Sequence, residues 1–381
     1  MEYNFDEIVR RRGTGAYKWD SLPNDHTIPM WVADMDFRTA PPIIEALARR
    51  VEHGVFGYAK TPAEAGEAVS HWFGRRHGFD VPPEWLLYTT GVVSAVSAII
   101  MAFTRKGDRV IIQPPVYNCF FSNIRNNDCE ILESELTYSE GRYTMDFDDL
   151  ERKAADPKAK IFLLCNPHNP AGRVWTREEL TRVADICRRH DVLVLSDEIH
   201  CDLAFAPHRH IPFASIDADN SITCSAPTKT FNIAGLHIAN IWVKDVELRR
   251  RVDRALNINE VCDLNAFATD ALIAAYNQGE EWLDALKLYL WDNYLRLKAF
   301  FHEHLPSLTV LPLEGTYLVW VDCSALGRTS DELAKALLAD GLKVNEGTMY
   351  GAAGEGFIRL NIACPRQQML KGLDIIKRTL G

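Results

Sequence analysis

The sequence predicts an α/β protein with a mostly parallel sheet flanked by helices and a smaller α+β domain beside it. Two observations predict this fold class. In the middle of the chain, short apolar runs alternate with helical patterns, as is typical of parallel strands covered on both faces. Towards the C-terminus, one helical pattern runs over 280–305; at about 38 Å it is long enough to leave one domain and enter another.

The elements follow from these patterns in chain order. We expect a large domain at 41–279, which begins with a helix at Thr39-Ala40-Pro41-Pro42. A smaller domain would combine 1–40 with 280–381. The predicted strands of the large domain are 85–88, 109–113, 160–165, 192–196 and 221–224, and its clearest helices are 91–104, 117–127 and 176–190. The small domain should contain strands at 316–321 and 356–360 and helices at 330–340 and 366–379.

Composition excludes several classes of protein. The 381 residues are 47% apolar and 25% charged, as in a soluble globular protein. A formal net charge of −10 argues against nucleic-acid binding, which needs clustered positive charge. The start of the chain lacks the apolar core of a signal peptide, and the run 92–103 is too short to span a bilayer. We therefore expect no membrane binding. The nine cysteines are scattered without a C-x-x-C pair, so we expect reduced thiols and a cytoplasmic protein.

The ends of the predicted strands carry polar residues, and ligands of open parallel sheets bind beyond such ends. The first strand leads into Thr89-Thr90-Gly91-Val92-Val93-Ser94 and then a helix. Backbone N–H groups at a helix start after a glycine form an anion site, although ordinary helix starts share this pattern. Another strand ends in NPHNPAG, a stiff loop in which Asn169 is either a donor to a ligand or part of a tight turn.

Two charged residues follow the next two strands. Asp197 ends the strand pattern VLVLSD, and Lys229 stands in SAPTKTFNIAG. Both are costly to desolvate unless a partner compensates them. They either form a structural ion pair with each other or bind a ligand that needs both groups. Pyridoxal 5'-phosphate needs such a set: a lysine for a Schiff base, a carboxylate on the ring nitrogen and an anion site for the phosphate.

A metal site is the other possibility at this end of the sheet. Cys201 lies beside His200 and Asp202 in the sequence. No second ligand cluster with zinc spacing appears, however. We therefore predict no metal.

Four motifs occur in a fixed order: NPHNPAG, SDEIH, APTKTFNIAG and FIRLNIACPR. In these motifs the chain resembles the pyridoxal-phosphate enzymes of fold type I, the aminotransferase class I/II family, over essentially its whole length. The stretches WVADMDFRTAPPIIEAL, HGVFGYAK, SDEIHCDL and MYGAAGEGFIRLNIACPR are similar to one subgroup, the MalY/PatB-like cystathionine β-lyases, or C–S lyases.

The resemblance implies roles for individual residues. Lys229 would be the Schiff-base lysine and the base for the substrate α-proton, and Asp197 would pair with the ring nitrogen. The ring would stack on Tyr117, which the resemblance also counts as catalytic. The remaining cofactor contacts would come from Asn169 and His200 near the 3-oxygen, and from Gly91, Val92, Val93 and either Ser225 or Thr228 at the phosphate.

The resemblance also implies the substrate side of the site. Arg359 would bind the substrate α-carboxylate with a two-pronged hydrogen bond, and Asn169, Ala33 and Tyr58 would lie nearby. Tyr58 would reach the cofactor phosphate of a neighbouring subunit. A homodimer with shared active sites is therefore expected.

The expected reaction is β-elimination from L-cystathionine or a related cysteine thioether, which gives a thiol, pyruvate and ammonia. An aminotransferase that uses the same residues is the alternative. A non-enzymatic regulatory protein on this fold is less favoured, because Lys229, Asp197 and Arg359 are all present. A nicotinamide dehydrogenase fits poorly, because no G-x-G-x-x-G follows a strand.

Overall fold

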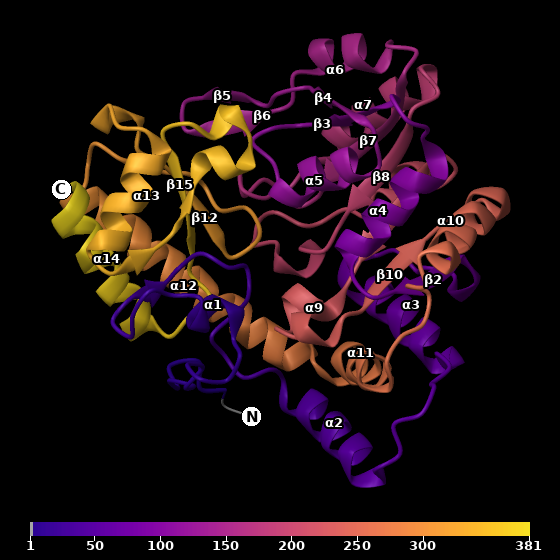
Figure 1. Ribbon diagram of the computed structural model, residues 1–381, viewed down its shortest axis with the longest axis horizontal. Coiled ribbons are helices and arrows are strands. Elements are labelled where there is room, and N and C mark those ends of the chain that lie inside the picture. The colour runs from indigo at the N-terminus through magenta and orange to yellow at the C-terminus, as the bar shows by residue number, and fades with distance from the viewer. Residues whose placement is uncertain (1–2) are drawn as a thin grey trace.

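Figure 1 shows the computed structural model of the protein, which describes residues 3–381. A seven-stranded sheet lies in the middle of the chain and a four-stranded sheet in its C-terminal part. In spatial order the large sheet consists of β2 (Leu86–Thr89), β10 (Ala239–Trp242), β9 (Ser221–Ser225), β8 (Leu193–Asp197), β7 (Ala159–Cys165), β3 (Arg109–Ile112) and β4 (Glu130–Glu133). The small sheet consists of β11 (Thr309–Val310), β12 (Leu318–Asp322), β15 (Phe357–Asn361) and β14 (Asn345–Glu346).

Helices separate most of these strands. They are α1 (Tyr17–Asp20), α2 (Pro41–His53), α3 (Ala63–His77), α4 (Val92–Phe103), α5 (Asn118–Asn126), α6 (Phe147–Ala154), α7 (Arg177–Arg189), α8 (Ala214–Asp217), α9 (Pro227–Thr230), α10 (Val246–Ile258), α11 (Ala266–Gln278), α12 (Glu280–His304), α13 (Ser330–Ala339) and α14 (Arg366–Leu380). Two short ribbons remain, β1 (Ile28–Pro29) with β13 (Leu342–Lys343) and β5 (Thr137–Ser139) with β6 (Arg142–Thr144). Among residues 3–381, no helix is long and apolar enough to cross a membrane.

The predicted α/β class is confirmed, and the predicted strands and helices are present with their ends moved by one or two residues. Two strands of the large sheet, β4 and β10, were missed. β10 pairs antiparallel with both β2 and β9, whereas β3, β4, β7, β8 and β9 run parallel. Its sequence, ANIW, is only four residues long, so no periodicity distinguishes it from the turn before it. The sheet is therefore mostly parallel, as predicted, with one antiparallel strand inside it.

Helices cover both faces of the large sheet because its strands alternate between two apolar cores. Along β7, Ile161 and Leu163 pack in one core, with α4, α5 and α10. Phe162 and Leu164 point the other way and pack with α6 and α7. Successive side chains of a strand point to opposite faces, so a strand buried on both faces needs the continuous apolar run seen in the sequence.

Strand register brings the polar strand ends together. Cys165 at the end of β7 pairs with Asp197 at the end of β8, and Asp197 pairs in turn with Cys224 of β9. β9 ends one residue later, and the single turn of α9 then carries Lys229. Asp197 and Lys229 thus reach the same edge of the sheet.

The N-terminal segment joins the C-terminal part of the chain. β1 runs parallel to β13, and α14 packs against both α12 and α13. In Figure 1, α13 and α14 lie with the small sheet at the left, and α4 and α10 lie with the large sheet at the right. These contacts support the division into 41–279 and into 1–40 with 280–381, which stays a prediction.

A buried ion cluster secures this segment. Asp36 receives Nζ of Lys18 at 2.9 Å and a guanidinium nitrogen of Arg11 at 2.7 Å, and both Lys18 and Asp36 are buried. The indole of Trp19 also donates to Asp36, at 2.8 Å. Burial raises the pKa of the Asp36 carboxyl, but Lys18, Trp19 and Arg11 more than offset this, so its pKa lies below the ordinary value.

Replacing Lys18 tests this cluster. In Lys18→Met, Asp36 keeps Arg11 but loses its buried ammonium partner, and breaking a buried pair on one side typically costs about 3–5 kcal/mol. We expect a loss of that order in the free energy of unfolding, measured by urea denaturation. The matched control is Lys335→Met, because Lys335 forms only an exposed ion pair with Asp331 and such pairs contribute little. Equal, small effects of the two changes would contradict the role of the cluster.

Candidate active site

A cavity of about 340 Å³ opens at the carboxyl edge of the large sheet. Its wall combines the ends of β7 and β8, the start of α4, the turn of α9 and the loop that contains Ala33. The lining residues are Ala33, Thr90, Gly91, Val92, Val93, Ser94, Tyr117, Cys165, Asn169, Asp197, Ile199, His200, Thr228, Lys229, Ala234, His237 and Ile238.

Lys229 extends from α9 into this cavity. Its Nζ donates to the carbonyl oxygen of Ala33 at 2.6 Å. Burial lowers the pKa of the Lys229 amine; Arg359 lowers it further, while Asp34 and Asp197 act against this. A buried lysine with a lowered pKa reaches its neutral, nucleophilic form more readily than an exposed one.

Asp197 faces the same cavity, and none of the ion pairs formed among residues 3–381 includes it. Among residues 3–381, its carboxylate receives one hydrogen bond, from the Ile199 N–H at 3.1 Å. Burial raises the pKa of Asp197 to about 7, with Glu198 adding to the effect, while the Ile199 N–H and Lys229 oppose it. Lys229 bonds to the Ala33 carbonyl and Asp197 to the Ile199 N–H, so the structural ion pair between them that was considered from the sequence is not formed.

The start of α4 also lines the cavity. Gly91 is the residue before the helix and has φ of 149°, a backbone conformation that residues with a Cβ rarely adopt. The first N–H groups of a helix have no partner within it and carry partial positive charge. Those of Val92, Val93 and Ser94 can therefore bind an anion in the cavity, which Thr228 also lines.

Arg359 reaches the site from β15 of the small sheet. Its guanidinium donates to Oδ1 of Asn169 at 3.1 Å and to the carbonyl oxygen of Trp31 at 2.7 Å. Its Nε is buried without a hydrogen-bond partner among the described residues. Because Oδ1 of Asn169 accepts from Arg359, the amide nitrogen of Asn169 is left to donate into the cavity.

His200 completes this side of the cavity. Burial lowers the pKa of its imidazole to about 3, with Lys229 and Arg359 adding to the effect, so the ring is neutral. Its Nδ1 is buried and has no partner among residues 3–381.

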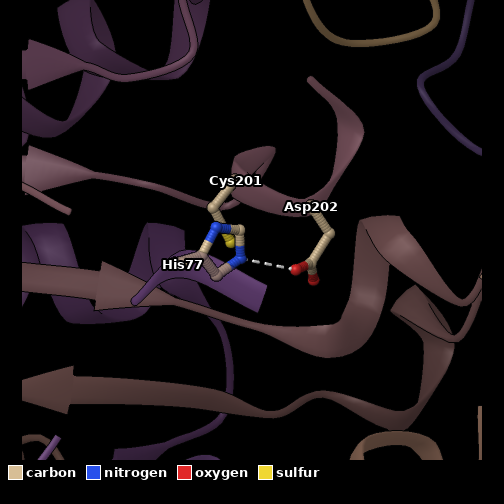
Figure 2. Close-up of side chains that lie close together, drawn as sticks. All are labelled: His77, Cys201 and Asp202. Atoms are coloured by element: carbon tan, nitrogen blue, oxygen red, sulfur yellow. Dashed lines mark hydrogen bonds and ion pairs between the residues drawn. The ribbon is translucent and has the colours of Figure 1, made fainter. Parts of the chain in front are cut away.

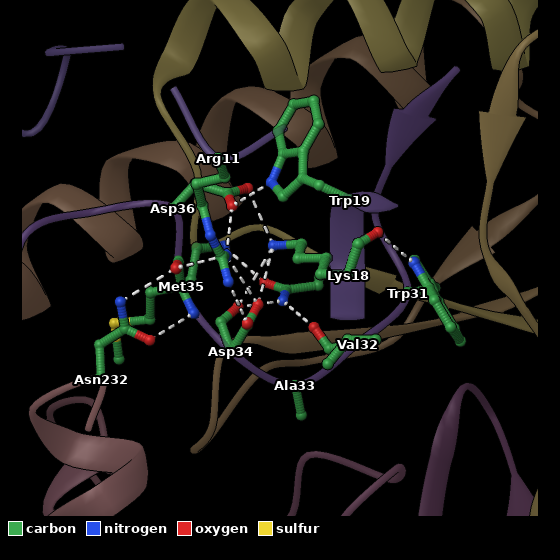
Figure 3. Close-up of polar contacts among 12 residues, drawn as sticks. Arg11, Lys18, Trp19, Trp31, Val32, Ala33, Asp34, Met35, Asp36 and Asn232 are labelled. Carbon is green, nitrogen blue, oxygen red and sulfur yellow. Dashed lines mark hydrogen bonds and ion pairs between the residues drawn. The ribbon is translucent and has the colours of Figure 1, made fainter. Parts of the chain in front are cut away.

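The loop from Trp31 to Met35 covers the lysine, and other side chains bind it mainly through its carbonyl oxygens. Asn361 donates to the carbonyls of Val32 and Asp34, at 2.5 and 2.7 Å. Asn232, three residues after Lys229, donates to the carbonyl of Met35 at 3.0 Å and accepts from its N–H at 2.9 Å. Figure 3 shows this loop between the Arg11–Lys18–Asp36 cluster and Asn232.

The structure brings most of the predicted residues together. The cavity is lined by Ala33, Gly91, Val92, Val93, Tyr117, Asn169, Asp197, His200, Thr228 and Lys229, and Arg359 contacts it through Asn169. Ser225 is buried outside the lining, where it accepts a 3.5 Å hydrogen bond from Asn240. Tyr58 is fully exposed on another surface, among Phe56, Ala266 and Phe267. The roles given to these residues stay predictions.

The sequence did not predict two kinds of contact in the site. The backbone carbonyls of Trp31 and Ala33 bind Arg359 and Lys229, and the Tyr317 hydroxyl donates to Ala33 at 3.0 Å. The motif WVADMDF pointed to the loop but could not reveal which of its backbone atoms take part, since carbonyl oxygens have no sequence signature.

A separate cluster joins Cys201 and Asp202 to His77, which lies far from them in the chain (Figure 2). The three residues offer ligand atoms within 4.8 Å of one another. The Asp202 carboxylate accepts three hydrogen bonds, from His77 at 2.8 Å, Trp72 at 2.9 Å and Thr230 at 2.8 Å. These bonds tie α3 to the turn that carries Lys229, which is a structural role.

The cavity fits pyridoxal 5'-phosphate. A buried carboxylate without a cation suits a protonated ring nitrogen, and a lysine with a lowered pKa suits an aldehyde. The free N–H groups of α4 suit a phosphate, and the Asn169 amide with neutral His200 suits the ring oxygen. These groups define the site of a pyridoxal-phosphate enzyme.

Comparison with known proteins agrees with this class. The chain belongs to the aminotransferase class I and II family, whose sequence model matches residues 26–376. The fold type I resemblance is thereby confirmed.

Individual relatives indicate which members of this family the chain resembles. The chain is 44% identical to cystathionine beta-lyase PatB of Bacillus subtilis (strain 168), over 99% of this chain and 100% of that protein. A PLP-bound putative aminotransferase from Clostridium difficile 630 superposes with a TM-score of 0.97 at 42% identity, covering 100% of both chains. The PLP-bound C–S lyase from Staphylococcus hominis superposes with a TM-score of 0.94 at 36% identity, covering 100% of this chain and 98% of that one. The predicted likeness to the PatB-like lyases is confirmed.

The raised pKa of Asp197 predicts a pH effect on the cofactor-free protein. Its folded pKa of about 7 exceeds the unfolded value of about 3.9. The associated stability is present below about pH 3.9 and is lost as the pH rises to about 7, by roughly 1.4 kcal/mol per pH unit. Asp197→Asn carries no charge, so its free energy of unfolding should improve relative to wild type by about 2–3 kcal/mol between pH 5 and pH 8.

Urea denaturation of both proteins at the two pH values measures this effect. Loading wild type with pyridoxal phosphate is the control, because a ring cation beside Asp197 should reduce the pH dependence. A difference between wild type and variant that is the same at pH 5 and pH 8 would show that Asp197 is not the titrating group.

Proposed function

We propose that the protein is a pyridoxal-phosphate-dependent C–S lyase that cleaves L-cystathionine or related cysteine thioethers into a thiol, pyruvate and ammonia by β-elimination. The observation that carries this proposal is the burial of Lys229 and Asp197 at one sheet edge without an ion pair between them. The identity of 44% with a cystathionine beta-lyase over nearly the full chain supports the substrate class.

The cofactor, when bound, accepts electron density from the substrate α-carbon. Asp197 keeps the ring nitrogen protonated, because its carboxylate is not already paired with another cation. Lys229 removes the α-proton, since its amine reaches the cavity and its pKa is lowered by burial. Arg359 binds the substrate carboxylate, with its unpaired buried Nε as a free donor. Tyr117, of the lining, stacks on the ring.

After removal of the α-proton, elimination and transamination compete. Elimination needs the Cβ–S bond held perpendicular to the ring plane, and such orientation is worth several kcal/mol. Transamination would instead need Lys229 to return the proton to another carbon while the Cβ–S bond stays intact. An aminotransferase therefore remains the second candidate, supported by the similarity to the putative aminotransferase from Clostridium difficile 630.

We also propose that the protein acts as a cytoplasmic homodimer. Tyr58 is fully exposed, and Val51, Val55 and Phe56 near it expose apolar surface. An exposed apolar patch of this kind suits a subunit contact, through which Tyr58 would reach the partner's cavity. All nine cysteines are free thiols, which suits a reducing compartment.

The reaction type is tested by product analysis. With L-cystathionine and no keto acid, we expect equal amounts of pyruvate, ammonia and homocysteine, because the thiolate leaves with the electron pair from the α-carbon and the amino group is released as ammonia, so no keto acid is needed for the next turnover. Lys229→Ala is the control and should release no pyruvate. Product that forms only after a keto acid is added would contradict the lyase and favour the aminotransferase.

Substrate binding is tested at Arg359. In Arg359→Ala, the loss of one side of a buried charged pair should cost about 2–5 kcal/mol, or roughly thirtyfold to several thousandfold in kcat/KM. Cofactor content, measured by absorbance, should stay normal because the groups proposed to hold the ring nitrogen and the phosphate are Asp197 and the start of α4. The control is Arg328→Ala, a partly exposed arginine in the loop before α13. An unchanged kcat/KM in Arg359→Ala would mean that another group binds the carboxylate.

A further inference from the structure

The hydroxyl of Tyr317 and the amine of Lys229 share one acceptor. Tyr317 directly precedes β12, is fully buried and donates to the carbonyl oxygen of Ala33 at 3.0 Å. The same oxygen accepts the Lys229 amine at 2.6 Å. The Tyr317 ring also meets the His200 ring edge to face, with centroids 6.0 Å apart.

Tyr317 is itself fixed in place. The Ile362 N–H donates to the Tyr317 carbonyl oxygen at 3.1 Å, and the next residue, Leu318, pairs with Asn361 in the small sheet. Asn361 in turn binds the carbonyls on both sides of Ala33. The small sheet therefore positions both the tyrosine and the acceptor that it contacts.

We propose that Tyr317 is a positioning residue for the proton transfers of Lys229, acting through the carbonyl oxygen of Ala33. The hydroxyl holds this oxygen in place and shares its lone pairs with the lysine. The Lys229 amine is then oriented towards the substrate, and its hydrogen bond to the Ala33 oxygen stays weak enough to break. The inference rests on the proposed function, in which Lys229 is the base.

The charges around Lys229 act in opposite directions, so the shared Ala33 oxygen affects whether the amine is protonated. Asp34 and Asp197 favour the charged ammonium, Arg359 disfavours it, and the other titratable groups that face it are Cys119 and neutral His200. Burial and Asp34 raise the pKa of Tyr317, so its hydroxyl keeps its proton and remains a donor. Without that donor, the Ala33 oxygen would accept from Lys229 alone and would favour the ammonium, which cannot take a proton.

Tyr317→Phe removes the hydroxyl and keeps the ring. The matched control is Tyr294→Phe, because Tyr294 is also a buried tyrosine that donates to a backbone carbonyl, that of Leu311 at 3.2 Å, but lies outside the cavity. The first measurement is exchange of the α-proton of L-alanine in deuterium oxide, followed by NMR with the holoenzyme. L-alanine has no leaving group, so exchange reports Lys229 in a lyase and an aminotransferase alike.

We expect exchange by Tyr317→Phe to fall by roughly 10- to 100-fold, as for a slightly misplaced catalytic group, and exchange by Tyr294→Phe to match wild type. The second measurement is the pKa of Lys229 in the cofactor-free protein, from its acetylation rate against pH by peptide mass spectrometry. It should rise in Tyr317→Phe and not in Tyr294→Phe.

Three results would overturn the proposal: exchange by Tyr317→Phe equal to wild type, an equal loss in Tyr294→Phe, or a Lys229 pKa that does not rise. The proposed function fails separately. If wild type exchanges the α-proton but releases no pyruvate from L-cystathionine, the lyase is wrong while the role of Tyr317 is still decided by the variant. If wild type shows no exchange, both are wrong.

Discussion

Two opposite charges are buried at one edge of the large sheet without neutralising each other, and the rest of the site depends on their separation. Asp197 ends β8, while Lys229 stands on the turn after β9 and bonds to the Ala33 carbonyl. Burial raises the pKa of the Asp197 carboxyl and lowers the pKa of the Lys229 amine. A bound group that compensates both charges would offset the cost of burying them, so the pair acts as a recognition element for that group.

The fold makes this separation possible by assigning the two charges to different supports. The strand register of β7, β8 and β9 determines where Asp197 lies. Lys229 is oriented from the opposite direction, by a loop that the small sheet and the N-terminal ion cluster secure. Arg359 links the two parts, because it extends from β15 and contacts Asn169 in the loop after β7. The cavity is therefore shaped by both sheets.

The large-sheet half of the site could be predicted from the sequence, because its chemistry sits at strand ends. One apolar run ends in Asp197, and the next is followed by a lone Lys229. Each pattern places a charge that is costly to desolvate at the carboxyl edge of a parallel sheet. Arg359 could not be found in this way, since it lies within a strand whose residues are all buried and only the family resemblance assigned it a role. The contact of Tyr317 with Ala33 spans 284 residues and ends on a backbone oxygen, so no local pattern reports it. Ser225 was a candidate because of its hydroxyl, but its place in β9 turns it away from the cavity lining.

The loop over Lys229 is bound largely through peptide carbonyls, and this affects how the protein can evolve. Asn361, Arg359 and Asn232 hold oxygen atoms that every amino acid possesses. A substitution at Ala33, which lines the cavity, would alter the surface offered to a substrate while leaving those oxygens where they are. Relatives could therefore diverge in the thioether they accept by changing this loop, without rebuilding the machinery that handles the proton.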